Sequence, residues 1–311
     1  MEPKLSSLSL SETTHNTFNT STPPPSSSYS TSSSSSVNRL WRPAAQRNMK
    51  NQWSRFNSLR QQWLSSSSTA RSHATSLVNA FLSQRYMKDM ELGVLSDMPN
   101  IQKKACWKLL KQQAIHRDNL LSSYKDMVAT VVSMVNTSTS LRCFLKGGTN
   151  SPFIQFSSNF EDINDNGDGG GVPVFTFWSI SSFEKIASEL VQMFKLELNL
   201  KRLLVVEFLS LTAKEDLITK KPSWSDEIYE GEHDDLSRCN LDCREFGLTD
   251  LASPNLDGCK SRILMQPTGQ PDSDVVQIYL TAWLTDVNMD KQRVDDIFSE
   301  VGEEMHVNFV S

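Results

Sequence analysis

The chain has 311 residues, with 31 Lys and Arg against 36 Asp and Glu, and a formal net charge of −5. No run of about 18 apolar residues occurs, so a transmembrane helix and a membrane partner are not expected. Five cysteines without a secretory apolar segment favour free thiols over a disulfide framework.

The charge is unevenly distributed along the chain. Through Lys88 the sequence has 10 basic residues against 2 acidic ones, a net of +8, and the remainder has 21 against 34, a net of −13. A basic N-terminal part can bind acidic partners or phosphates, or it can dock on the acidic remainder of the same chain.

Residues 1–37 are rich in Ser and Thr and include Pro23, Pro24 and Pro25. Such a segment buries too little apolar surface to offset the entropy lost on ordering, so we expect a disordered tail. Its Ser-rich, acid-poor composition is also that of an organelle transit peptide, although arginines begin only at Arg39.

Residues 38–66 are expected to form a basic helical arm, in which cationic side chains alternate with Trp41, Trp53 and Trp63 and interspersed glutamines favour a helix. Basic and aromatic side chains together can neutralise and stack on nucleic acid. The alternative is an exposed helix whose Trp residues pack on the domain. The candidate nucleic-acid contacts are Arg39, Arg42, Arg47, Lys50, Arg55 and Arg60.

Residues 67–311 are expected to form one domain that begins with two helices. The Ser65–Thr69 run offers N-caps for a helix over residues 71–87. A long apolar stripe at helical spacing predicts a second helix from Ile101 to about Val135.

Beyond residue 140 the pattern predicts an α+β domain in which long central helices pack on a mostly antiparallel sheet. Two further helices are expected over residues 183–200 and 290–305, and residues 212–274 are expected to be a long irregular insert. The predicted strands are Leu141–Leu145, Phe153–Phe156, Val172–Ile180, Leu203–Leu211 and Val275–Leu284.

No catalytic or cofactor motif is present, so we expect neither enzymatic activity nor a cofactor. The acidic loop that starts at Asp162 fails the calcium-loop pattern, because its twelfth position is Pro173. Four residues between positions 233 and 259 have ligand chemistry without the close pairing of structural zinc sites, so no metal is expected. These residues are His233, Cys239, Cys243 and Cys259.

The segment 222–236 combines Trp224 and Tyr229 with a dense set of acids. Aromatic anchors within a charged rim suit a partner-binding surface. The alternative is a loop that those same side chains fasten to the domain.

Three stretches carry a resemblance to a known family: LVNAFLSQRYMKDMELGVL (77–95), KKACWKLLKQQ (103–113) and ELVQMFKLELNLKRLLVVEFL (189–209). Together they resemble the comet family of HORMA-like adaptors, which bind the spindle-checkpoint protein Mad-two. The resemblance implies a HORMA-like fold and a non-catalytic adaptor that presents a HORMA-fold partner of the checkpoint or the meiotic chromosome axis to an AAA+ ATPase.

The same resemblance places Gln84 and Phe194 at the partner interface and the protein in the nucleus, with the cytoplasm as the alternative. The helix at residues 290–305 departs from the family, whose chains tend to end in strands. A nuclear nucleic-acid or chromatin-binding protein that uses residues 38–63 is the alternative function.

Overall fold

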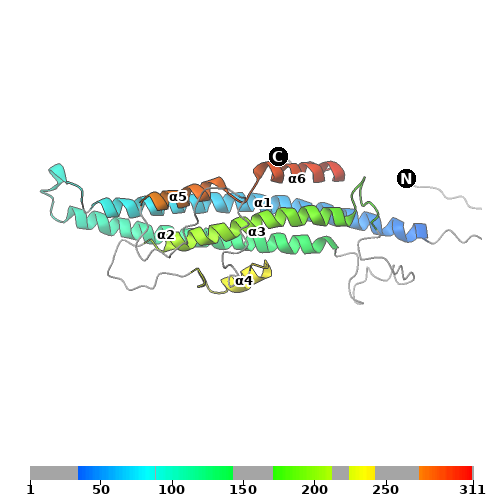
Figure 1. Cartoon of the computed structure of the whole chain (residues 1–311), viewed down its shortest axis with the longest axis horizontal. Helices are drawn as coiled ribbons and strands as arrows, with labels where there is room; N and C mark the ends of the chain where they lie inside the picture. Colours follow the sequence, from blue (N-terminus) through cyan, green and yellow to red (C-terminus); the bar gives the residue numbers. More distant parts are fainter. Residues whose placement is uncertain (1–33, 88, 143–170, 212–223, 242–272, 310–311) are drawn as a thin grey trace, which may run out of the picture.

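The computed structural model describes residues 34–87, 89–142, 171–211, 224–241 and 273–309, and describes side chains from Arg42 onward. The described residues form an elongated bundle of helices without a strand (Figure 1). Its helices are α1 (Ser34–Met87), α2 (Ile101–Thr139), α3 (Ile180–Leu209), α4 (Glu232–Arg238), α5 (Ser273–Thr285) and α6 (Lys291–Met305), with short 3-10 turns η1 (Gly93–Leu95) and η2 (Ser140–Arg142).

The two longest helices, α1 and α2, form an antiparallel hairpin. Near the start of α1, the Asn48 amide donates to the carbonyl oxygen of Ser140, just beyond α2, at 3.1 Å. At the opposite end, the Gln113 amide donates to Oε1 of Gln84 at 2.7 Å. One polar contact therefore marks each end of the α1–α2 seam.

The inward positions of α1 recur in alternating steps of four and three residues, the repeat of a coiled coil. Arg60, Ser67 and Gln84 interrupt an otherwise apolar seam. The repeat consists of Met49, Trp53, Phe56, Arg60, Trp63, Ser67, Ala70, Ala74, Leu77, Phe81 and Gln84.

The Ser65–Thr69 run lies inside α1, so the prediction that it caps a new helix was wrong. The Ser66 and Thr69 hydroxyls donate to the carbonyl oxygens four residues earlier, at 3.0 and 2.9 Å. This local bonding lets hydroxyl side chains remain within a helix. As a result α1 is continuous through residues 66 and 67, where the sequence suggested a boundary between arm and domain.

Helix α3 lies antiparallel to α2 and completes a three-helix core. Its first turn is joined to η2, just beyond the end of α2, by the Arg142–Glu184 ion pair, and Arg117, sixteen residues after the start of α2, donates to the carbonyl oxygen of Leu211. Phe194 of α3 packs edge-on against Trp63 of α1, with ring centroids 5.4 Å apart.

The C-terminal helices α5 and α6 cover α1 and α3 (Figure 1). The indole nitrogen of Trp283 in α5 donates to the carbonyl oxygen of Ser67, and Phe298 of α6 packs edge-on against Trp53. Both buried Trp residues of α1 are therefore in the core, as the packing alternative for the basic arm expected.

The α+β prediction was wrong. The strongest predicted strand, Leu203–Leu211, consists of the end of α3 and the two residues that follow this helix. A nearly continuous apolar run fits a two-face-buried strand, but also a helix that is surrounded by others. Here α1, α2 and α5 contact α3, and the helical pattern from Ile180 onward contains no residue that ends it.

Val275–Leu284 was also predicted as a strand and lies within α5. Its inward side chains, Val276, Tyr279, Leu280 and Trp283, follow the i, i+3, i+4, i+7 spacing of a helix. Because both segments are helical, the described residues contain no central strands for the sheet of a HORMA-like fold. The prediction of that fold was therefore wrong as well.

The remaining predicted strands are not found among the described residues. Residues 172–179 form an irregular loop that leads into α3, in which the Val174 amide donates to the carbonyl oxygen of Trp178. Leu141 and Arg142 end η2. Several predicted segments lie outside the residues that the structure describes. They are the rest of Leu141–Leu145, the segment Phe153–Phe156, most of the insert 212–274 and the tail before residue 34.

The Phe194–Trp63 contact provides a test of the three-helix core. Replacing Phe194 by Ala should reduce the free energy of unfolding by about 3 to 5 kcal/mol, because a large cavity opens beside Trp63. Chemical denaturation measures the loss. The matched control Leu196→Ala, at a side chain 44% exposed on the same helix, should change stability by less than about 1 kcal/mol; equal losses for both would contradict this packing.

Candidate interaction surface at the end of the α1–α2 hairpin

The α1–α2 hairpin projects beyond the end of α3 (Figure 1). The Arg117–Leu211 hydrogen bond marks the level at which α3 ends. The sixteen residues of α2 that precede Arg117 extend about 24 Å at 1.5 Å per residue. We call residues 82–116 the projecting end.

The projecting end concentrates exposed apolar side chains. It holds seven of the fifteen large hydrophobic residues that are exposed in the described part of the chain. Contiguous exposed apolar groups mark interaction sites more often than isolated ones do. The seven are Tyr86, Met90, Val94, Leu95, Met98, Trp107 and Ile115.

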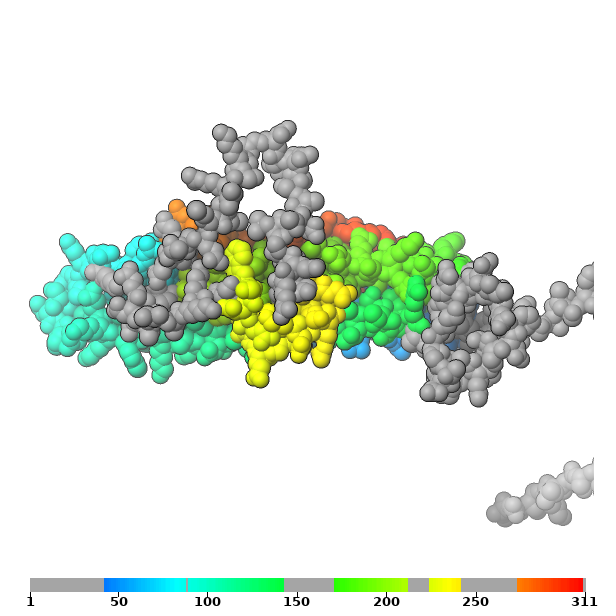
Figure 2. All heavy atoms as spheres, turned by 60° about the horizontal axis from the view of Figure 1, so that its bottom comes forward, coloured from blue at the N-terminus to red at the C-terminus, as the bar shows by residue number. Residues whose placement is uncertain are grey.

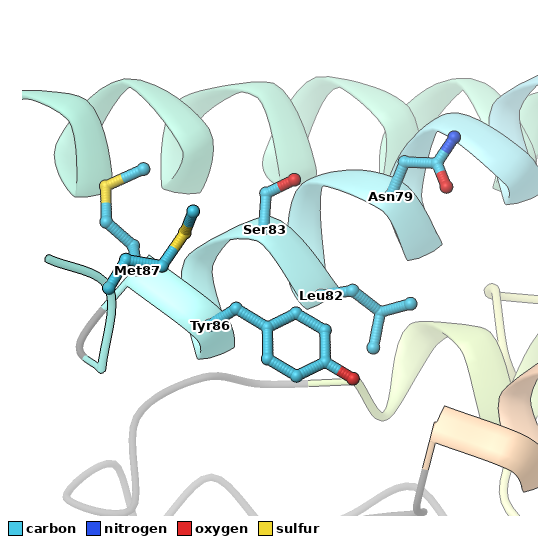
Figure 3. A pocket seen from close by; sticks show the side chains of 6 residues that line it. Asn79, Leu82, Ser83, Tyr86 and Met87 are labelled. Carbon is cyan, nitrogen blue, oxygen red and sulfur yellow. The ribbon is translucent and has the colours of Figure 1, made fainter.

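An open, mostly apolar hollow of about 690 Å³ lies along the end of α1 (Figure 3). Leu82 and Tyr86 point away from α2, Met87 lies toward the end of α1, and Met90 also lines the hollow. Methionine side chains adapt readily to different apolar partners. The hollow is therefore suited to receive an apolar side chain rather than to enclose a small molecule.

A basic face lies on α2 of the projecting end. Between Asp97 and Asp118 the sequence has no acidic residue, and Trp107 is 67% exposed. The Lys111 ammonium lies 5.9 Å from the centre of the Trp107 ring, within the range of a cation–π contact. We define the basic face as Lys103, Lys104, Trp107, Lys108 and Lys111, all exposed.

Polar pairs join α1 and α2 in the projecting end and at its base. Besides the Gln84–Gln113 bond, His73 of α1 and His116 of α2 approach within 3.4 Å through their Nδ1 atoms. Burial, and then the charge of His73, lower the pKa of His116. The pair is therefore most stable when it is not doubly protonated.

An acidic segment, residues 226–235, lies farther along α2 and includes the start of α4 (Figure 2). It contains six Asp and Glu and no Lys or Arg. Its buried Glu232 accepts from Arg202 Nε at 2.9 Å, from the Tyr124 hydroxyl at 2.6 Å and from the Ile228 amide at 2.7 Å. Burial and the Glu232 charge raise the pKa of Tyr124, so this hydroxyl remains a donor.

The two residues that the family resemblance placed at a partner interface are inside the bundle. On α1, Gln84 is 6% exposed and accepts a hydrogen bond from Gln113. On α3, Phe194 is fully buried against Trp63. These side chains join helices of the same chain and offer no surface to a partner.

Trp224, just before the acidic segment, and Tyr229, within it, are bound to the bundle. The Trp224 indole is 37% exposed and donates to Glu207 at 3.2 Å. Tyr229 packs edge-on against Tyr124, and its hydroxyl donates to Asp235 at 3.2 Å. Both aromatic side chains thus contact the bundle in the way that the alternative interpretation of residues 222–236 expected, as anchors that fasten the loop to the domain.

The basic arm divides into bound and exposed cations. Arg42 donates to the carbonyl oxygens of Val174 and Phe175, and Arg60 pairs with Asp295. Lys50 is exposed, with its ammonium 5.7 Å from the centre of the Phe175 ring. Arg47 and Arg55 are also exposed, and the side chain of Arg39 lies outside the description.

No group of three or more potential metal ligands occurs within the described ranges. None of the helices in that part of the chain is both long and apolar enough to cross a bilayer. Cys106 and Cys239 are free thiols, and Cys143, Cys243 and Cys259 lie outside the description.

The basic face was not singled out from the sequence, although a signal was available. An acid-free stretch with four lysines surrounds Trp107. The apolar stripe of the same helix indicates its core positions, and only the end of α3 near Leu211 shows that α3 does not reach the first turns of α2.

No protein-family model and no curated protein matches the chain.

The His73–His116 pair makes the projecting end sensitive to pH. Because the pKa of His116 is lower in the folded protein than the ordinary 6.5, the unfolded chain takes up the proton more readily. Stability should therefore fall as the pH drops from about 7 through 6.5 and below, and should be unaffected above that range.

His116→Gln should reduce the difference in urea midpoint between pH 7.5 and 5.5. The control His233→Gln should retain the difference; identical profiles for His116→Gln and the wild type would contradict the role of the pair.

The Glu232 cluster holds the acidic segment on the bundle. Glu232→Ala leaves the Arg202 guanidinium buried without its carboxylate, so we expect a loss of about 3 to 5 kcal/mol in unfolding free energy. The double variant Glu232→Ala with Arg202→Met should recover part of that loss, as measured by denaturant unfolding. Asp235→Asn, at a half-exposed carboxylate of the same segment, serves as the control and should cost under about 1 kcal/mol.

Proposed function

We propose that this protein is a non-catalytic adaptor that binds another polypeptide through the projecting end of its α1–α2 hairpin. The observation that carries the proposal is the basic face, where exposed lysines surround an exposed Trp107. Trp is prominent among residues that dominate binding energy at protein interfaces. The lysines favour a partner that presents acidic side chains beside an apolar group.

The charges of the turn favour a polypeptide over a uniformly anionic surface. Asp89, Glu91 and Asp97 lie exposed between α1 and α2, next to the exposed Met90 and Met98. These carboxylates would be repelled by anionic lipid headgroups or by a phosphate backbone that covered the whole end. A polypeptide can place its acids on the basic face alone and its apolar groups elsewhere.

The bundle supplies the rigidity that such a surface requires. The projecting end continues directly from the α1–α2 seam, whose apolar members Trp53, Phe56 and Trp63 are buried. A preformed surface loses less conformational entropy on binding than a loop that must first become ordered. The hairpin therefore functions as a firm arm that extends from a packed core.

The narrower expectations remain predictions. The family resemblance implies a HORMA-fold partner, an AAA+ ATPase and a nuclear location. The projecting end is the surface at which binding of such partners would be tested. Nucleic-acid binding by the basic arm also remains a prediction, now centred on the exposed Arg47, Lys50 and Arg55.

Site-specific photocrosslinking tests the proposal in the cells that make the protein. A benzophenone amino acid replaces Trp107 in the full-length chain, and irradiated adducts are analysed by mass and by sensitivity to protease and nuclease. We expect a polypeptide adduct at position 107, reduced at least tenfold when Lys103 and Lys111 are changed to Glu.

The matched control carries the same amino acid at Ile278, which is 63% exposed on α5 and distant in sequence from the basic face. We expect this position to give only background adducts. Equal adducts at both positions, or an adduct at position 107 that nuclease removes, would overturn the proposal.

A further inference from the structure

We propose that the acidic segment of a second copy of this chain binds the basic face, so that two copies associate about a two-fold axis. This inference rests on the proposed function and names the partner of the same surface. It follows from the position, shape and charge of two surfaces that lie along one helix, α2.

The basic face and the acidic segment lie on the same side of α2. Tyr229 of the acidic segment lies over Lys125 of α2, whose ammonium is 4.8 Å from the ring centre. Trp107 precedes Lys125 by 18 residues, about five turns at 3.6 residues per turn. The two positions therefore share one line along the helix, about 27 Å apart.

The two surfaces differ in height. At Tyr124 and Lys125 the acidic segment forms a layer above α2, whereas at Trp107 the indole of α2 itself is 67% exposed. The side of α2 therefore has a raised acidic part and a lower basic part. Figure 2 shows the α4 region standing on the bundle, with the turn end of the hairpin extending to one side.

A two-fold axis perpendicular to α2 near residue 116, midway between Trp107 and Lys125, would bring each raised part onto the lower part of the other copy. Such an interface is isologous, because each copy contributes the same two surfaces. One association thus forms two identical contacts, and the arrangement closes without leading to a filament.

The charges are complementary where the two surfaces would meet. The basic face contributes four lysines within a stretch that lacks acids. On the acidic segment, Glu227, Glu230 and Asp234 are exposed, whereas Glu232 is buried against Arg202. These exposed carboxylates lie within five residues of Tyr229 in the sequence, so each surface combines like charges with one aromatic ring.

Reciprocal charge reversal in the full-length protein tests the inference. One variant carries Lys103→Glu with Lys111→Glu, and the other carries Glu230→Lys with Asp234→Lys. Mass is measured by analytical ultracentrifugation at protein concentrations up to about 100 μM, in the range of weak complexes, and at low and high salt.

We expect the wild type to form a dimer at low salt and to dissociate as salt screens the contacts. Each variant alone should be a monomer, with a dissociation constant raised at least tenfold, and an equal mixture of the two should form a dimer. In the mixed dimer both contacts again pair opposite charges, so recovery excludes misfolding of either variant as the cause.

The control variant Arg47→Glu with Arg55→Glu changes the net charge by the same amount as the lysine variant, at exposed positions of α1, and should remain dimeric. A monomeric wild type at low salt, or a mixture that stays monomeric, would overturn the inference. If a crosslink from position 107 to a different protein persists in that case, the proposed function survives; if no polypeptide adduct forms either, both fail.

Discussion

The α1–α2 seam is the contact on which the other described elements depend. Its a/d repeat runs from Met49 to Gln84 on α1, and α2, which contacts α1 along the hairpin, buries Leu120, Met127 and Met134. In proteins most of the stability of a helix comes from the packing of its apolar face, and α1 presents this stripe over most of its 54 residues. Helix α3 packs on both members of the hairpin, and α5 and α6 cover parts of α1 and α3.

The smaller elements are fastened to this core by buried carboxylates. Glu232 holds the acidic segment through Arg202 and Tyr124. Glu304 of α6 accepts the amides of Thr176, Phe177 and Trp178 at 2.7 to 2.9 Å and so fixes the loop that leads into α3. A buried carboxylate is costly unless its oxygens are satisfied, so each arrangement selects one position for the segment that it binds.

Helix α2 changes character along its length, and this change places the proposed surface. In its second half, Tyr124, Met127 and Val131 are buried among helices, whereas in its first turns Trp107 is exposed and the contacts to α1 are polar. The end of α3 near Leu211 separates the two parts. The same helix thus supports the core at one end and offers an uncovered face at the other.

Much of the helical content could be predicted from the sequence. The helices expected over residues 71–87, 101–135 and 183–200 lie within helices of the structure, and the one expected over 290–305 corresponds to α6 with its N-cap Asp290, because their apolar spacing repeats over several turns. The strands failed where apolar runs were short: Leu203–Leu211 and Val275–Leu284 are compatible with either structure when each is considered alone. The missed α1 seam had a readable four-three repeat, but the Ser65–Thr69 run concealed it by resembling a cap.

The sequence by itself determined which residues are apolar, how they are spaced and where the charges cluster. It did not determine which of them are covered. Phe194 and Trp107 are both large aromatic residues on amphipathic helices, yet one is buried against Trp63 and the other is exposed. Burial depends on where neighbouring helices begin and end in space, and those positions result from packing between segments that are far apart in the chain.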